Sequence, residues 1–129
     1  MVSVFDTRPC SLGEGPLWHP LRGELLWFDI NAHQLLSKTA VWQFDEYVSA
    51  AGWISHDELL IASESQLFRF HLGDHNQTKL CDLEANNPIT RSNDGRCDPQ
   101  GGFWIGTMGK KAEAKAGAIY RYYRGNLVQ

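Results

Sequence analysis

Apolar residues along this chain gather in short runs of about four to six positions, bounded by Gly, Pro, Asn, Asp and Ser. Runs of this length between turn-forming residues are typical of β-strands. The best helical candidate, residues 110–116, is short and lies between Gly109 and Gly117, so we expect a loop there. The pattern therefore predicts an all-β chain.

The turn-and-strand pattern occurs three times. Residues 15–30, which contain GPLWHP and then ELLWFDI, have a counterpart at 95–107, and a middle copy fits 51–63. Pro20 and Pro99 hold corresponding places 79 residues apart, which is about two units of forty. Four short strands per unit of about forty residues are typical of β-propeller blades. We predict three blades, at about 14–46, 47–85 and 91–129.

Each unit is expected to hold four strands. They are residues 16–19, 25–30, 34–38 and 40–44 in the first unit, 49–54, 58–63, 66–72 and 78–83 in the second, and 96–97, 103–107, 118–123 and 126–129 in the third. The five tryptophans of the chain are expected to fill the spaces between blades.

Composition and charge narrow the function. The chain has 129 residues, of which 43% are hydrophobic and 21% charged, with a net charge of −3 and a pI near 5.9. This is the profile of one ordinary globular domain, and the scattered Lys and Arg argue against a nucleic-acid partner. The apolar runs are far too short to span a membrane, and residues 1–6 lack a signal-peptide layout, so a cytoplasmic location is expected.

The spacing of the cysteines and histidines indicates neither a disulfide framework nor a metal site. The three cysteines are an odd number without CxxC spacing, which indicates reduced structural thiols rather than disulfides or a zinc site. The five histidines lack HxxxH and HxH spacing and are expected to be structural. No GxSxG, P-loop or GxGxxG motif is present, which disfavours a serine nucleophile and nucleotide chemistry.

Glu14 is the first candidate for chemistry. It lies between Gly13 and Gly15 just before a predicted strand, where a carboxylate can approach a central axis without neighbouring side chains in the way. Calcium and magnesium prefer carboxylate and amide oxygens, so this position suits a metal ligand. On position alone, a solvated turn residue remains the more ordinary reading.

Residues 91–95, with the sequence RSNDG, are the second polar cluster. Asn-Asp-Gly most often marks a turn, and this reading is favoured without further context. The functional reading is that Arg91 forks two hydrogen bonds onto substrate oxygens while Asn93 offers a donor and an acceptor to a sugar hydroxyl. The cluster would then suit a polyhydroxylated ligand.

Three segments together resemble one family. LGEGPLW at 12–18, RSNDGRCDPQGGFWIGTM at 91–108 and GAIYRY at 117–122 are similar to the gluconolactonase and regucalcin (senescence marker protein) family. The resemblance runs the full length of the chain but covers only the N-terminal half of a typical member. It implies a six-bladed propeller that hydrolyses sugar lactones with one divalent cation at its axis, of which this chain forms three blades.

The resemblance also implies roles for particular residues. Glu14 would bind the cation, which could be calcium, zinc, magnesium or manganese, and Arg91 and Asn93 would contact the substrate. Asp94 would lie near the metal, through water. The remaining two metal ligands of the family, an Asn and an Asp that doubles as the base, fall beyond Gln129, so no catalytic residue is expected within this chain and we expect it to be inactive by itself.

One position departs from the family. Some members have a substrate-contacting Glu that aligns near Lys111, where the charge is reversed, and Glu113 is close but out of register. The substrate could therefore differ. In the implied reaction the cation polarises the lactone carbonyl and a carboxylate activates water.

Two other functions stay open. One is a non-catalytic propeller that acts as a cation-binding or protein-interaction module. The other is a strictosidine-synthase-like enzyme, which is disfavoured because Glu14 would not be expected there.

Three blades would expose two open sheet faces, so we expect either a missing half or self-association. The final strand has no closing signal, which favours the missing half; alternatively, two copies could close a ring of six blades. Residues 2–5 could form the strand that completes the last blade in the family.

Overall fold

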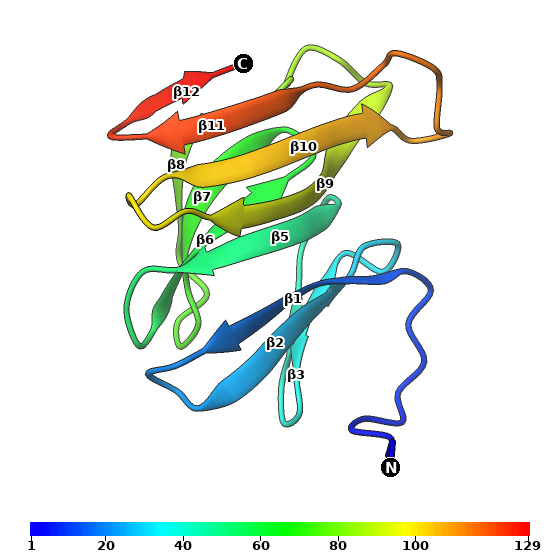
Figure 1. Cartoon of the computed structure of the whole chain (residues 1–129), viewed down its shortest axis with the longest axis vertical. Helices are drawn as coiled ribbons and strands as arrows, with labels where there is room; N and C mark the ends of the chain where they lie inside the picture. Colours follow the sequence, from blue (N-terminus) through cyan, green and yellow to red (C-terminus); the bar gives the residue numbers. More distant parts are fainter.

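The computed structural model describes all residues, 1–129, and contains twelve strands in three four-stranded antiparallel sheets, without helices (Figure 1). The all-β propeller fold with four-stranded blades is thus confirmed. Blade 1 comprises β1 (Gly13–His19), β2 (Glu24–Asp29), β3 (Gln34–Ser37) and β4 (Val41–Gln43). Blade 2 comprises β5 (Val48–Trp53), β6 (Glu58–Ser63), β7 (Gln66–His71) and β8 (Gln77–Asp82). Blade 3 comprises β9 (Thr90–Cys97), β10 (Phe103–Gly109), β11 (Ile119–Tyr123) and β12 (Asn126–Val128).

The first strands of the three blades lie side by side in the middle of the chain's fold. In every sheet the strands pair in chain order from first to fourth, so β1, β5 and β9 each form one edge of their sheet. Strand β5 packs between β1 and β9, and all three run in the same direction (Figure 1). Their starting ends therefore lie at the same end of the molecule.

The core lies between the blades rather than within one sheet. Strand β6 shows this arrangement most clearly, because Leu59 and Ile61 pack in the cluster shared with blade 1 while Leu60 and Ala62 pack in the cluster shared with blade 3. All four are buried. Since both faces of β6 are covered, its sequence is a continuous apolar run rather than an alternating one.

The tryptophan prediction is confirmed at Trp42 and wrong at Trp18 and Trp53, and at Trp104, which lies on the outer face of blade 3, it stays a prediction. Trp42 is buried between blades 1 and 2, where its Nε1 donates a hydrogen bond to the carbonyl oxygen of Leu72 at 2.9 Å. Trp18, Trp53 and Trp104 are 59%, 42% and 46% exposed. Trp18 and Trp53 lie on the inner strands, where they line a hollow of about 320 Å³ together with residues of β9.

The N-terminal segment lies outside the three sheets. Residues 1–12 contain no strand, so within this chain residues 2–5 complete no blade. The Phe5 ring instead meets Trp27 of β2 edge-on, with 6.2 Å between ring centroids.

The segment between β10 and β11 forms turns, as predicted for residues 110–116. No helix in the structure is long and apolar enough to cross a membrane.

Candidate functional site

Each inner strand is interrupted by a β-bulge near its starting end. In β1 the register shifts between Glu14 and Leu17, and in β5 it shifts between Val48 and Ala50. In β9 the shift falls opposite Gly106, where Asn93 and Asp94 together face one partner residue. A bulge turns a side chain out of the regular alternation of a strand. Glu14 therefore borders the bulge of blade 1, whereas Asn93 and Asp94 form the bulge of blade 3.

The turn predicted at residues 91–95 is wrong. These residues lie within β9, and the ladder to β10 continues on both sides of the bulge, with Ser92 opposite Thr107 and Gly95 opposite Ile105. Glu14 likewise lies inside β1 rather than in a turn before it. Polar residues that favour turns are here part of bulged strands.

Glu14 presents an exposed carboxylate. It takes part in none of the ion pairs of the chain. The following residue, Gly15, has φ +61°, and a Cβ there would lie 2.3 Å from the carbonyl oxygen of Ser49 in β5. Only glycine allows β1 to approach β5 so closely. The close approach fixes the position of Glu14 relative to the neighbouring blade.

Arg91 is buried, with 7% of its surface exposed. Its Nη1 donates to the carbonyl oxygen of Ser92 at 2.8 Å and to Oδ1 of Asn93 at 3.2 Å. Burial lowers the pKa of Arg91, while Tyr47 and Glu14 are near enough to oppose that change. The Nε and Nη2 groups of Arg91 make no hydrogen bond within the protein. Every fully buried side-chain polar atom of the chain has a hydrogen-bond partner, so these two groups are in contact with solvent.

The other polar residues of β9 are fixed by short contacts. The Asp94 carboxylate accepts a hydrogen bond from the backbone N–H of Gly95 at 2.9 Å, and Asp94 is exposed. Ser92 Oγ accepts a hydrogen bond from Ser49 Oγ at 2.7 Å, deep between β9 and β5. This buried pair ties together the two inner strands at the level of Arg91 and Asn93.

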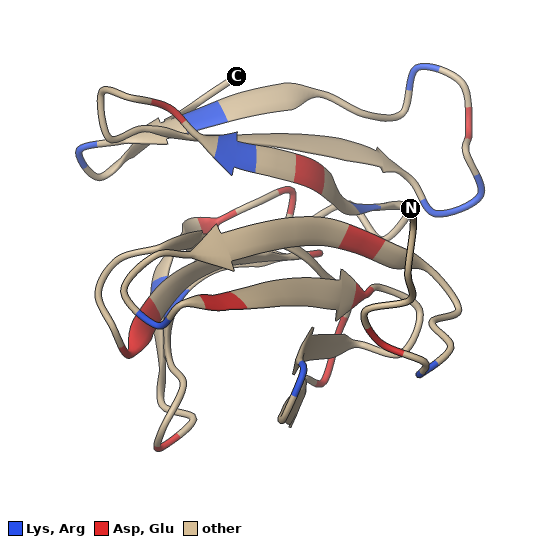
Figure 2. Cartoon of the chain, turned by 60° about the horizontal axis from the view of Figure 1, so that its bottom comes forward, with Lys and Arg blue, Asp and Glu red and all other residues tan.

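Lys111 and Glu113 lie in the segment after β10. Because β10 is antiparallel to β9, that segment returns to the starting end of β9 (Figure 1). Glu113 Oε1 accepts the backbone N–H of Lys111 at 2.7 Å, so its carboxylate closes its own turn. The neighbouring Lys110 pairs with Glu64 of blade 2 at 2.6 Å. Figure 2 shows acidic and basic residues interspersed over the blades, without a continuous basic stripe.

The sequence analysis missed Glu84, whose carboxylate connects three strands. It accepts hydrogen bonds from Thr90 Oγ1 of β9 at 2.6 Å, Thr107 Oγ1 of β10 at 3.0 Å and Tyr120 OH of β11 at 2.9 Å. Burial, together with the Glu84 carboxylate, raises the pKa of Tyr120 to about 12. Thr90 directly precedes Arg91, so Glu84 holds the beginning of the strand that carries the polar cluster.

Replacing Glu84 by Gln is expected to lower the free energy of unfolding by about 1–2 kcal/mol, because charged hydrogen bonds become neutral ones. It should also lower the pKa of Tyr120, as followed by ultraviolet absorbance of the phenolate. In the original chain, unfolding free energy should fall as pH rises from about 10 towards the raised pKa, since the unfolded tyrosine ionises first.

The matched control is Glu58→Gln, which breaks an exposed pair with Arg69 at 3.5 Å. Such a pair contributes little, so a change within about 0.5 kcal/mol is expected. Equal effects of the two substitutions would contradict the role given to Glu84.

The donor set fits part of a hard-cation site. Glu14 and Asp94 offer carboxylate oxygens, a donor type that calcium and magnesium prefer. Nowhere in the chain do three His, Cys, Asp or Glu side chains gather in a way that could hold a metal ion. The chain thus supplies oxygen donors without a complete site.

Three four-stranded blades that pack along their inner strands, two of which carry Glu14, Arg91 and Asn93 near their starting ends, define part of a β-propeller. The sequence profile of the SMP-30/Gluconolactonase/LRE-like region matches residues 12–129, so the chain belongs to this family.

Individual relatives agree with this membership. The chain is 32% identical to YvrE of Bacillus subtilis, provisionally named a sugar lactone lactonase, over 99% of this chain and 46% of that protein. It is 34% identical to the L-arabinolactonase of Azospirillum brasilense over 95% of this chain and 42% of the relative.

A solved structure gives the same picture. The crystal structure of regucalcin from Agrobacterium tumefaciens, described as a calcium-binding protein, is 39% identical and superimposes with a TM-score of 0.92. The match covers 95% of this chain and 44% of that structure. The chain therefore spans less than half the length of the relatives it matches.

Proposed function

We propose that this chain forms the substrate-orienting half of a sugar-lactone hydrolase assisted by a divalent cation. The observation that supports it most directly is Arg91, a buried guanidinium with reachable Nε and Nη2 donors, because the exposed carboxylate of Glu14 lies near enough to oppose the lowering of the Arg91 pKa by burial. The lactonase names of the relatives support the same reaction class.

In this proposal Glu14 holds the cation, and Asp94 lies beside it through water. When bound, the cation supplies electrophilic polarisation of the lactone carbonyl. Its identity follows from the oxygen donors only as far as a hard cation such as calcium, magnesium or manganese, with zinc as a further candidate. The calcium-binding description of the Agrobacterium relative favours calcium as the first ion to test.

The substrate contacts are assigned to Arg91 and Asn93. Nη1 of Arg91 donates to the carbonyl oxygen of Ser92 and to Oδ1 of Asn93, and the second of these hydrogen bonds orients the Asn93 side chain. Nε and Nη2 of Arg91 and the amide N–H groups of Asn93 then donate to lactone and hydroxyl oxygens. The water-activating base is assigned to a part of the propeller that this chain does not include, since the chain matches less than half the length of its relatives.

A chimera tests this proposal. We suggest joining the chain to the part of the Azospirillum L-arabinolactonase that lies beyond its match, and assaying lactone opening with calcium, magnesium, manganese and zinc. The chimera should hydrolyse a sugar lactone, whereas the chain by itself should not. A chimera that folds as a monomer yet opens no sugar lactone with any cation, while the parent enzyme does, would contradict the proposal.

A further inference from the structure

His19, the last residue of β1, is fully buried where blade 1 meets blade 2. Its Nε2 lies 2.9 Å from the carbonyl oxygen of Ser55 in the β5–β6 turn, and its Nδ1 lies 3.3 Å from the backbone nitrogen of Arg22 in the β1–β2 turn. A carbonyl oxygen only accepts and a backbone N–H only donates, so Nε2 carries the proton and Nδ1 is the acceptor. This contact therefore requires a neutral imidazole.

The charged groups around His19 come from the same two turns and from β2. Arg22 pairs with Glu24 of β2 at 2.7 Å and with Asp57 of the β5–β6 turn at 3.1 Å. The His56 ring lies edge-on to His19, with 6.4 Å between ring centroids, and its Nδ1 donates to Asp57 at 2.8 Å. Both carboxylates thus already have partners, and a protonated His19 would lie beside Arg22 with its charge only partly balanced.

Protonation of His19 is unfavourable in the folded chain. Burial lowers the pKa of His19 and the charges of Arg22 and His56 act in the same direction, against the Ser55 hydrogen bond and the Glu24 carboxylate. A proton on Nδ1 would also face the N–H of Arg22, and that hydrogen bond would be lost. The unfolded chain takes up this proton near pH 6.5 and the folded chain only at lower pH, so the contact stabilises the fold above that pH and loses its effect as pH falls.

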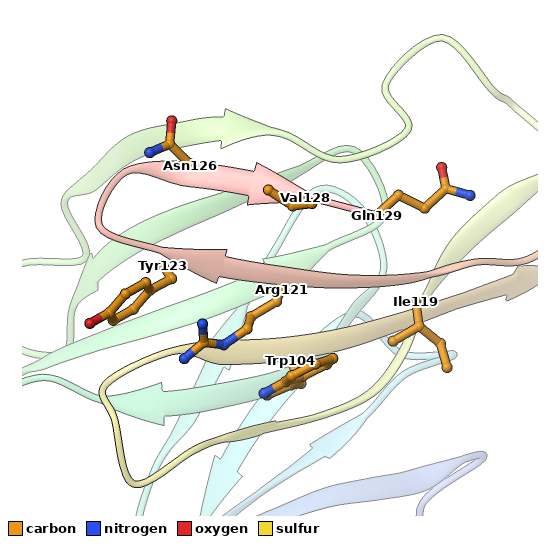
Figure 3. Close-up of a pocket in the computed structure, with 7 residues that line it drawn as sticks. All are labelled: Trp104, Ile119, Arg121, Tyr123, Asn126, Val128 and Gln129. Atoms are coloured by element: carbon orange, nitrogen blue, oxygen red, sulfur yellow. The ribbon is translucent and has the colours of Figure 1, made fainter.

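Blade 3 has a different acceptor at the equivalent turn. Asp98, which is followed by a proline as His19 is, accepts the backbone N–H of Gly102 at 2.8 Å through Oδ1. Its Oδ2 accepts Nε of Arg121 at 2.8 Å and Nε1 of Trp104 at 2.9 Å, two side chains that lie beside one another in Figure 3. These hydrogen bonds hold the pKa of Asp98 well below its usual value, so this turn keeps its acceptor in mild acid. The turn of blade 1 depends instead on a histidine, the side chain that titrates closest to neutral pH.

We propose that His19 is a pH-sensitive latch between blades 1 and 2. While its ring is neutral, it joins the β1–β2 turn to the β5–β6 turn, and once protonated it releases the Arg22 N–H and repels the Arg22 guanidinium. The latch lies at the opposite ends of β1 and β5 from the close approach of Gly15 to Ser49, so the two contacts together hold these inner strands along their length. Mild acid loosens one of the two. Both blades belong to this chain, so the contact needs no further part of the propeller.

Urea unfolding of the chain at pH 7.5 and at pH 5.5 tests the latch. A histidine that stays neutral in the folded chain and protonates in the unfolded one raises the unfolding constant up to about tenfold over this range. His19→Asn retains an acceptor for the Arg22 N–H but takes up no proton, so this part of the acid response should disappear. The matched control is His75→Asn, because His75 is exposed and its φ of 64° suits asparagine. Its acid response should equal that of the original chain.

Nuclear magnetic resonance titration of the imidazoles in the folded chain gives a second readout, in which the His19 ring should stay neutral well below pH 6.5. An equal acid response in His19→Asn and the original chain overturns the proposal, because a variant weakened by the same factor at both pH values would give His19 a structural role alone. A His19 ring that protonates near pH 6.5 with the fold intact overturns it as well. The titration needs no variant, so it decides by itself if His19→Asn does not fold.

Discussion

Replacing Gly15 by alanine is expected to lower the free energy of unfolding by about 3 kcal/mol. The residue has φ +61°, where a side chain is strained, and its new Cβ would lie 2.3 Å from the carbonyl oxygen of Ser49 and 3.0 Å from Cδ2 of Phe28. A backbone oxygen of the neighbouring blade cannot swing aside as a flexible side chain can. Positive φ and overpacking each cost about 1–3 kcal/mol, and both apply here.

Gly23 provides a matched control. It has φ +63°, almost the same backbone conformation, but a Cβ there would meet nothing within 4 Å. Gly23→Ala should therefore report the conformational cost alone, about 1 kcal/mol. Urea denaturation of both variants measures the difference. Equal losses would show that β1 does not depend on close approach to β5, and the explanation for how Glu14 is positioned would fail.

Much of the fold could be predicted because the relevant signals are local. Strand β6 extends over the predicted residues, Glu58–Ser63, since an apolar run that is buried on both faces differs clearly from the turns around it. Strand β9 was predicted far too short, because Asn, Asp and Gly favour bulges and turns alike. Only the ladder to β10, which pairs residues distant in sequence, distinguishes the two.

The candidate site was less predictable than the fold. Glu84 gave no sequence signal, because its partners Thr90 and Tyr120 come from separate strands and meet it only after blades 2 and 3 pack. The exposure of Trp18 depends likewise on its place on an inner strand. The family resemblance pointed to Glu14, Arg91 and Asn93, and the structure adds that Glu14 borders the bulge of β1 and that Asn93 lies in the bulge of β9, with Arg91 two residues before Asn93. Their roles in binding remain predictions.

Glu14→Gln in the chimera described above is expected to reduce kcat/KM at low cation concentration by roughly 100-fold or more. Glutamine preserves the size of the side chain but removes the charge that a hard cation prefers in a ligand. Since Glu14 makes no ion pair within the protein, its loss should leave folding unchanged. Calorimetric titration with calcium measures the binding defect independently of catalysis.

Asp94→Asn is the graded comparison. Its carboxylate already accepts the backbone N–H of Gly95, and a residue that contacts the metal through water typically changes affinity or activity by about 10–100-fold. We expect a smaller loss than for Glu14→Gln, and recovery of both variants as the cation concentration rises. A larger loss of activity in Asp94→Asn would mean that Asp94 binds the cation directly and that Glu14 contacts it through water. Full activity of Glu14→Gln would instead remove Glu14 from the metal site and leave Arg91 and Asn93 as substrate contacts of a site whose cation lies elsewhere.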